Sequence, residues 1–134
     1  MWEDKILLCK RAIEPQWGKW TLPAGFMENG ETVQQAAARE TMEEALAKVS
    51  DLHLFGMFNI PHVNQVYVMF RARMPECEFA PGTESLSCEL VTEERIPWTE
   101  IAFPVVDRTL KLFFEDRRND RFQIHTGDIA PRRR

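Results

Sequence analysis

The sequence predicts a single domain of the α/β class. Alternating or apolar runs with the length of β-strands occur at residues 5–11, 51–60, 65–73 and 85–96. Two other segments, 33–47 and 105–116, have helical propensity or helical periodicity. The chain of 134 residues is 44% apolar, which is enough for one hydrophobic core, and no repeat or linker divides it.

Composition and charge narrow the classes of function. The net charge of -4 and pI near 5.4 argue against a general nucleic-acid or membrane-surface binder. Three cysteines without CxxC spacing indicate reduced thiols, because neither a disulfide framework nor a zinc site follows from them. No apolar run approaches the roughly 18 residues that span a bilayer. We expect a cytoplasmic protein with a small-molecule ligand and no nucleic-acid or membrane partner.

The N-terminal segment predicts a buried strand at Lys5–Arg11 (KILLCKR). The preceding WED resembles a hairpin turn, yet only Met1 and Trp2 remain for the strand beyond it. Three explanations stay open: a bare sheet edge, an edge covered by a second subunit in a homodimer, or a longer natural chain that supplies the first strand.

A loop and a short extended segment follow. Pro15 and Gly18 mark residues 12–19 as a loop, and WTLP after it is extended. Trp17 and Trp20 could stack on a base, although tryptophans more often supply core area, and we favour the packing role.

The first helix has a readable start and a distinctive composition. Thr32 and Gln35 form a capping-box pattern after an Asn-Gly turn, and residues 33–47 contain five alanines and no Gly or Pro. We expect the alanine side, around Ala36, to lie close to a sheet. Met42 and Leu46 lie toward the opposite flank and are expected in the core.

The second half of the chain predicts a hairpin, a strand and a helix. Residues 51–60 and 65–73 should pair as an antiparallel hairpin around PHVN. Residues 85–96 suggest another strand, 97–101 a turn or short helical segment, and 105–116 an amphipathic helix. Residues 117–134 are interpreted as a charged C-terminal extension, with Arg132–Arg134 as a solvated end.

Three carboxylates on the first helix predict a metal site. Glu40, Glu43 and Glu44 stand at i, i+3 and i+4, so their side chains project from one helical face. Like charges at this spacing repel each other and do not favour folding. Hard divalent cations such as Mg²⁺ or Mn²⁺ require clustered oxygen ligands, which explains the pattern.

The spacing of the charged residues resembles a known signature. Gly25, then Glu31, then the pairs 39–40 and 43–44 stand at the fixed intervals of the Nudix box of Nudix hydrolases. The departures from that box are Thr41, Leu46 and Ala47, which affect packing and the helix end. The segments KILLCKRAIEP and WTLPAGF are similar to the branch of ADP-ribose and FAD pyrophosphatases, in which LPAGFMENGET recurs.

The resemblance implies a fold and a reaction. The fold is a Nudix α/β/α sandwich with a mixed sheet between helices, with its first strand open to question. The reaction is Mg²⁺- or Mn²⁺-assisted hydrolysis of a nucleoside diphosphate derivative, such as ADP-ribose or FAD, into AMP and a phosphorylated partner. The ligands implied for the cation are the Gly25 carbonyl, Glu40, Glu43 and Glu44. Arg39 would pair with Glu31 or Glu43 and orient the carboxylates.

The general base and the substrate contacts stay open. Glu43 or Glu44 is a candidate base, and in relatives of this kind a later loop can supply it, which adds Glu84 and Glu89. Candidate substrate contacts are Trp20, Phe58 and Glu84. The signature of NADH pyrophosphatases is absent downstream of the box, which disfavours NADH. The alternatives are removal of oxidised nucleoside triphosphates and a catalytically silent nucleotide-binding module.

Overall fold

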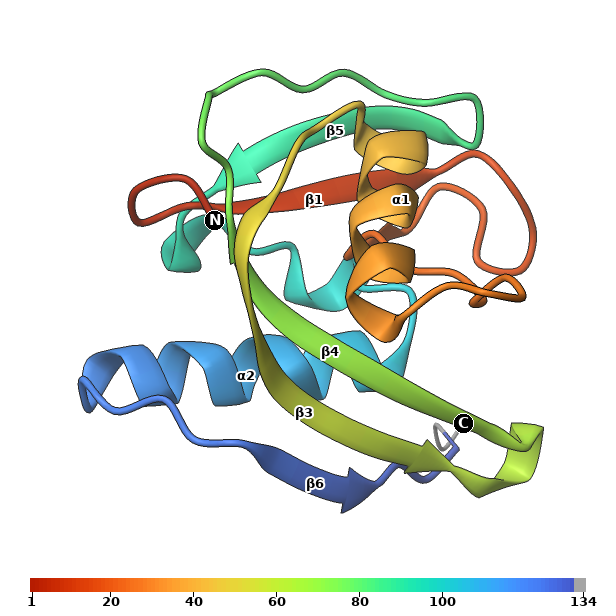
Figure 1. Cartoon of the computed structure of the whole chain (residues 1–134), viewed down its shortest axis with the longest axis vertical. Helices are drawn as coiled ribbons and strands as arrows, with labels where there is room; N and C mark the ends of the chain where they lie inside the picture. The colour runs from red at the N-terminus through yellow and green to blue at the C-terminus, as the bar shows by residue number, and fades with distance from the viewer. Residues whose placement is uncertain (132–134) are drawn as a thin grey trace.

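The computed structural model describes residues 1–131 as two three-stranded sheets and two main helices (Figure 1). The elements in chain order are β1 (Ile6–Arg11), β2 (Trp20–Thr21), α1 (Val33–Ala45), β3 (Ser50–Ile60), β4 (Gln65–Arg73), β5 (Ser85–Val91), α2 (Pro104–Arg118) and β6 (His125–Asp128). Short 3-10 turns cover Pro61–Val63, Glu93–Arg95 and Trp98–Glu100. One sheet has the order β2-β1-β5 and the other the order β4-β3-β6.

Strand β1 separates two hydrophobic cores. Its side chains alternate: Ile6 and Leu8 belong to the large core with α2, whereas Leu7 and Cys9 belong to a smaller core with Ala45 at the end of α1. Because successive strand residues point to opposite faces, the two helices lie on opposite sides of this sheet. Figure 1 shows α1 beside β1 and β5, with α2 in the other half of the molecule. The predicted α/β/α arrangement is therefore confirmed.

The predicted hairpin is also confirmed. Strands β3 and β4 pair antiparallel, with Phe58 opposite Tyr67 and Ile60 opposite Gln65. Asn64 closes the turn in a left-handed conformation at φ 55°, a region that asparagine tolerates. Phe55 and Phe58 of β3 are buried in the large core, so this hairpin supplies much of the platform against which α2 packs.

A C-terminal strand, not anticipated from the sequence, completes the second sheet and makes it mixed. Strand β6 pairs parallel to β3, with His125 opposite Gly56 and Asp128 opposite Asn59. His125 Nε2 lies 2.8 Å from Oδ2 of the buried Asp116 on α2. This contact connects α2 to β6, and Ile129 after the strand is buried in the large core. The terminal Arg132–Arg134 lie outside the described residues.

The N-terminal segment contacts the second sheet. Trp2 and Lys5 form an isolated antiparallel bridge, which confirms the turn at WED. The Met1 amino group donates to the Ala72 carbonyl at 2.9 Å, and Met74 N–H donates to the Met1 carbonyl at 2.8 Å. Residue 1 is therefore hydrogen-bonded across to the end of β4.

Helix α1 starts where the sequence predicts and ends earlier. The capping box of Thr32 and Gln35 is present in both directions. The helix stops at Ala45 because Leu46 adopts a left-handed conformation with φ 47°. The expectation that Met42 and Leu46 lie in the core is wrong, since they are 38% and 49% exposed. Among the described residues, no helix is long and apolar enough to cross a membrane.

Candidate active site

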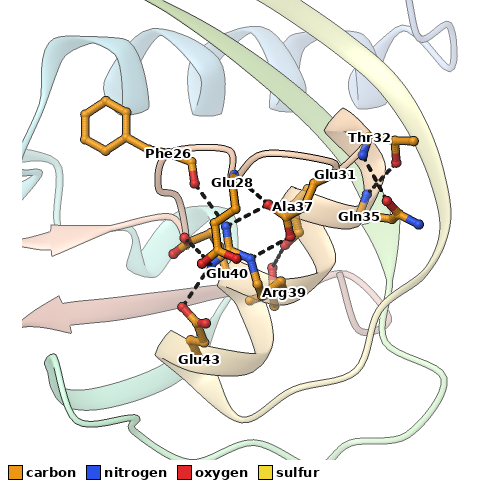
Figure 2. Close-up of polar contacts among 10 residues, drawn as sticks. Phe26, Glu28, Glu31, Thr32, Gln35, Ala37, Arg39, Glu40 and Glu43 are labelled. Carbon is orange, nitrogen blue, oxygen red and sulfur yellow. Dashed lines mark hydrogen bonds and ion pairs between the residues drawn. The ribbon is translucent and has the colours of Figure 1, made fainter.

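Arg39 lies at the centre of a cluster of glutamates (Figure 2). Its Nε donates to Oε2 of Glu31 at 2.7 Å, and its second terminal nitrogen donates to Oε1 of the same carboxylate at 3.0 Å. This bidentate geometry is the strongest form of the arginine–carboxylate pair. The hydrogen bond from Arg39, helped by the Glu28 N–H, lowers the pKa of Glu31, while the bond to Glu31 raises the pKa of Arg39. Both groups therefore stay charged.

The same guanidinium also contacts two carboxylates of α1. One terminal nitrogen of Arg39 lies 2.8 Å from Glu40 Oε1 and 3.2 Å from Glu43 Oε2. A further bond, from Arg39 to the Phe26 carbonyl at 2.9 Å, connects the helix to the preceding loop. The predicted pairing of Arg39 with Glu31 or Glu43 is confirmed with both partners. The repulsion expected between Glu40 and Glu43 is thus offset by the Arg39 guanidinium, which contacts both carboxylates.

Gly25 lies against the carboxyl group of Glu40. A Cβ atom at position 25 would stand 2.2 Å from Glu40 Cδ, well inside van der Waals contact. A side chain at position 25 would therefore push aside the Glu40 carboxylate, which Arg39 holds in place.

Glu44 occupies a different environment from its two neighbours on the helix. Its Oε2 accepts a hydrogen bond from the Ala24 N–H at 3.1 Å. Burial raises the pKa of Glu44 to about 7, and the charges of Glu40 and Glu84 add to that rise, while the Ala24 bond and Arg11 oppose it. In the metal-free protein, Glu44 therefore exchanges its proton close to neutral pH.

The loop before β5 fixes the end of α1. Gly82 N–H donates to the Glu44 carbonyl at 3.0 Å, and Ser85 Oγ donates to the same oxygen at 2.9 Å. A Cβ at position 82 would lie 1.8 Å from the Glu43 carbonyl oxygen. Neither Gly82 nor Ser85 was identified from the sequence, since a glycine in a polar loop has the pattern of an ordinary turn. Only the packing of this loop on the helix end shows its role in positioning Glu43 and Glu44.

The oxygen atoms of these residues are suitable ligands for a hard cation, although they are not arranged in a metal-binding geometry. Three carboxylates and a glycine carbonyl are the oxygen ligands that Mg²⁺ or Mn²⁺ accepts. Across residues 1–131, no group of three or more acidic, histidine or cysteine side chains is placed so that it could hold a metal ion. The reason is visible in the contacts: Glu40 and Glu43 are turned toward Arg39, and Glu44 toward Ala24.

The other residues singled out from the sequence lie in three different environments. Trp20 is half-buried and packs against the large core. Phe58 is 0% exposed, so it offers no face to a ligand, and we leave it out of the proposed site. Glu84 is exposed and near enough to Glu44 to affect its pKa. Glu89 is exposed on β5, opposite Leu8.

The site is thus a strand–loop–helix that carries an arginine-organised carboxylate cluster inside an α/β/α sandwich. Residues 1–113 match the sequence model of the NUDIX domain. The chain therefore belongs to the Nudix family. A solved Nudix hydrolase from Nitrosomonas europaea is 51% identical, superposes with a TM-score of 0.94, and is matched over 98% of this chain and 74% of its own.

Two named relatives share parts of the sequence. An ADP-ribose pyrophosphatase from Methanocaldococcus jannaschii is 44% identical over 61 residues, which cover 44% of this chain and 35% of that protein. The NAD-capped RNA hydrolase NudC of Photobacterium profundum is 31% identical over 115 residues, which cover 82% of this chain and 43% of the relative. The chain thus spans less than half the length of either relative.

Proposed function

We propose that this chain hydrolyses the diphosphate bond of a nucleoside diphosphate derivative, with ADP-ribose as the first choice of substrate. The products are AMP and a phosphorylated partner, and the reaction depends on Mg²⁺ or Mn²⁺. The observation that carries the proposal is the cluster in which Arg39 holds Glu31, Glu40 and Glu43 beside the half-buried Glu44.

The residues have distinct roles in the proposed reaction. Glu40, Glu43 and Glu44, with the Gly25 carbonyl, would hold the cation, which when bound supplies charge neutralisation at the diphosphate. Arg39 keeps two of the carboxylates in place and stays charged, so its role is positioning. Glu44 is the proposed proton acceptor for the attacking water, because its carboxylate is held by the Ala24 N–H, apart from the ion pairs of Arg39; its raised pKa describes the metal-free protein.

Substrate preference is proposed from the relatives. An ADP-ribose pyrophosphatase is among them, which supports ADP-ribose over FAD. The match to NudC over most of this chain adds a second candidate, a dinucleotide of the NAD type, which the sequence disfavoured. Both candidates contain an adenosine diphosphate whose central anhydride is the bond to be broken.

The experiment is a substrate panel with Mg²⁺ and with chelator. ADP-ribose, FAD, NADH and an oxidised nucleoside triphosphate are compared, and products are identified by chromatography and mass spectrometry. We expect AMP from ADP-ribose, and loss of turnover with chelator or in Glu44→Gln. The matched control is Glu94→Gln, an exposed glutamate outside the cluster.

Three outcomes would contradict the proposal in different ways. Pyrophosphate release from the oxidised triphosphate, faster than AMP release from ADP-ribose, would assign the chain to nucleotide-pool cleaning. Tight ADP-ribose binding by calorimetry without turnover would assign it to a silent binding module. Full activity of Glu44→Gln would remove Glu44 from the chemistry.

We also propose that the chain forms a homodimer through the surface around the β3–β4 hairpin. β4 is an edge strand of its sheet, and Val63 and Val66 at the hairpin end are 46% and 56% exposed. Exposed apolar residues at the end of an edge strand favour association. Light scattering on the wild type and on Val66→Lys tests this, because a monomeric wild type would contradict it.

A further inference from the structure

Two of the three cysteines lie directly opposite each other in the sheet beneath the proposed active site. Cys9 on β1 and Cys88 on β5 are register partners, and their Sγ atoms are 3.4 Å apart. Directly opposed residues of antiparallel strands have Cα separations of about 4.5 or 5.5 Å, depending on the type of pair. Both values lie within the range that a disulfide bridges, and formation of the bond needs the sulfur atoms to approach by only about 1.4 Å.

The pair is in direct contact with the end of the carboxylate helix. Cys9 Sγ lies 3.9 Å and Cys88 Sγ 3.6 Å from the main-chain carbonyl oxygen of Glu44. This is the oxygen that also accepts from Gly82 and Ser85. Two of the groups that contact the last glutamate of the helix are therefore oxidisable thiols.

We propose that Cys9 and Cys88 are a modification site at which a hydroperoxide forms a reversible disulfide beneath Glu44, loosening the anchoring of that residue. The remaining cysteine, Cys77, is exposed and takes no part.

The reaction starts at Cys88, because Cys88 is half-buried whereas Cys9 is 2% exposed. The Cys88 sulfur attacks one peroxide oxygen and loses its proton, the O–O bond breaks, and the departing hydroxide takes that proton as water. The Cys9 sulfur then attacks the sulfur of the Cys88 sulfenic acid, the S–O bond breaks, and the departing hydroxide takes the Cys9 proton as a second water. The two thiols have lost two electrons and hydrogen peroxide has gained them.

The disulfide would also change the contacts of Glu44. An oxidised pair has no S–H to donate, so the Glu44 carbonyl keeps only its bonds from Gly82 and Ser85. This second part of the proposal rests on the proposed hydrolase function, whereas formation of the bond does not.

The first experiment maps the bond in the whole chain. Trypsin leaves Cys9 on peptide 6–10 but leaves Cys77 and Cys88 together on peptide 74–95, so the protein carries Cys77→Ser. After treatment with hydrogen peroxide and blocking of free thiols, we expect a linked peptide 6–10/74–95 that dithiothreitol separates. The matched control, Cys88→Ser in the same background, should give no linked peptide.

The outcomes separate the two parts of the proposal. A Cys88 sulfenic acid that dimedone traps, without any linked peptide, overturns the disulfide, as does a complete lack of reaction. If the peptide forms, hydrolysis of the best panel substrate should fall severalfold and recover with dithiothreitol, but not change in Cys88→Ser. A linked peptide with an unchanged rate overturns the coupling to Glu44. Absence of hydrolysis in the untreated protein counts against the proposed function alone.

Discussion

Arg39 donates two hydrogen bonds to the carboxylate of Glu31, eight residues earlier in the chain, with N···O distances of 2.7 and 3.0 Å. The pair connects the loop after Gly25 to the middle of α1, and the same guanidinium then reaches Glu40 and Glu43. An arginine in this position organises a set of carboxylates from two consecutive segments. The arginine holds these carboxylates together, whereas their like charges alone would push them apart.

The bidentate geometry predicts that lysine cannot replace Arg39. Arg39→Lys keeps the charge but offers one compact ammonium to three carboxylates. We expect kcat/KM for the best substrate to fall by about 10- to 100-fold, as is typical when a partner that orients metal ligands is lost. The control is Arg73→Lys, since the pair of Arg73 with Asp51 is long, at 3.7 Å, and exposed. Equal activity of the two variants would show that the bidentate bond from Arg39 to Glu31 is not needed for catalysis.

Close approach predicts a large effect of one methyl group at Gly25. Gly25→Ala places a Cβ 2.2 Å from Glu40 Cδ and must displace that carboxylate. A displacement of this size near a reacting centre costs on the order of 100-fold in rate. Gly18→Ala is the control, since its Cβ meets nothing within 4 Å while its φ of +80° costs about 1 kcal/mol of stability. We expect Gly18→Ala to be less stable but active, and the reverse result would contradict this interpretation.

The raised pKa of Glu44 predicts a pH-dependent stability in the absence of metal. Its pKa rises from 4.5 to about 7 in the folded protein. Between these two values the unfolded chain releases the proton that the folded state retains, so the free energy of unfolding falls as pH rises. After allowance for its partial exposure, the loss is roughly 1–3 kcal/mol, complete above pH 7.

Urea unfolding with chelator at pH 5 and pH 8 measures this effect. Glu44→Gln cannot titrate, so its stability should change less between the two pH values than that of the wild type. Glu94→Gln should follow the wild type. Parallel pH profiles for wild type and Glu44→Gln would show that Glu44 ionises in the folded protein at its ordinary pKa.

The left-handed residue at the end of α1 predicts a stabilising substitution. Leu46 has φ 47°, and its N–H donates to the Met42 carbonyl at 3.0 Å, the position where helices usually carry glycine. Its side chain is largely exposed, so little buried area is lost on removal. Leu46→Gly should raise the free energy of unfolding by up to about 1 kcal/mol, whereas Leu46→Ala should not, because alanine keeps the Cβ. Urea unfolding of both variants checks the difference, and equal stabilities would contradict the argument.

Local features of the fold were predictable from the sequence. The capping box of Thr32 and Gln35, the β3–β4 hairpin and the amphipathic helix α2 depend on residues close together in the chain. The Glu40–Glu43–Glu44 face of α1 is local in the same sense, since helical geometry alone brings these side chains together.

Other features depended on contacts between distant segments. Strand β6 has the sequence HTGD, without an apolar alternation, and becomes a strand through parallel pairing with β3. Phe58 is a candidate substrate contact in the sequence, yet the large core buries it completely.

The carboxylate site likewise has features set by local sequence and features set by contacts between distant segments. The sequence by itself determined which acids stand on one face of α1 and that Arg39 lies among them, because both follow from helical spacing. Only the tertiary structure decided that Glu44 is half-buried, that Gly82 contacts the end of the helix, and that Cys9 and Cys88 meet beneath it. These depend on the approach of α1, β1 and β5 in space, which is set by the packing of the two cores rather than by any local pattern.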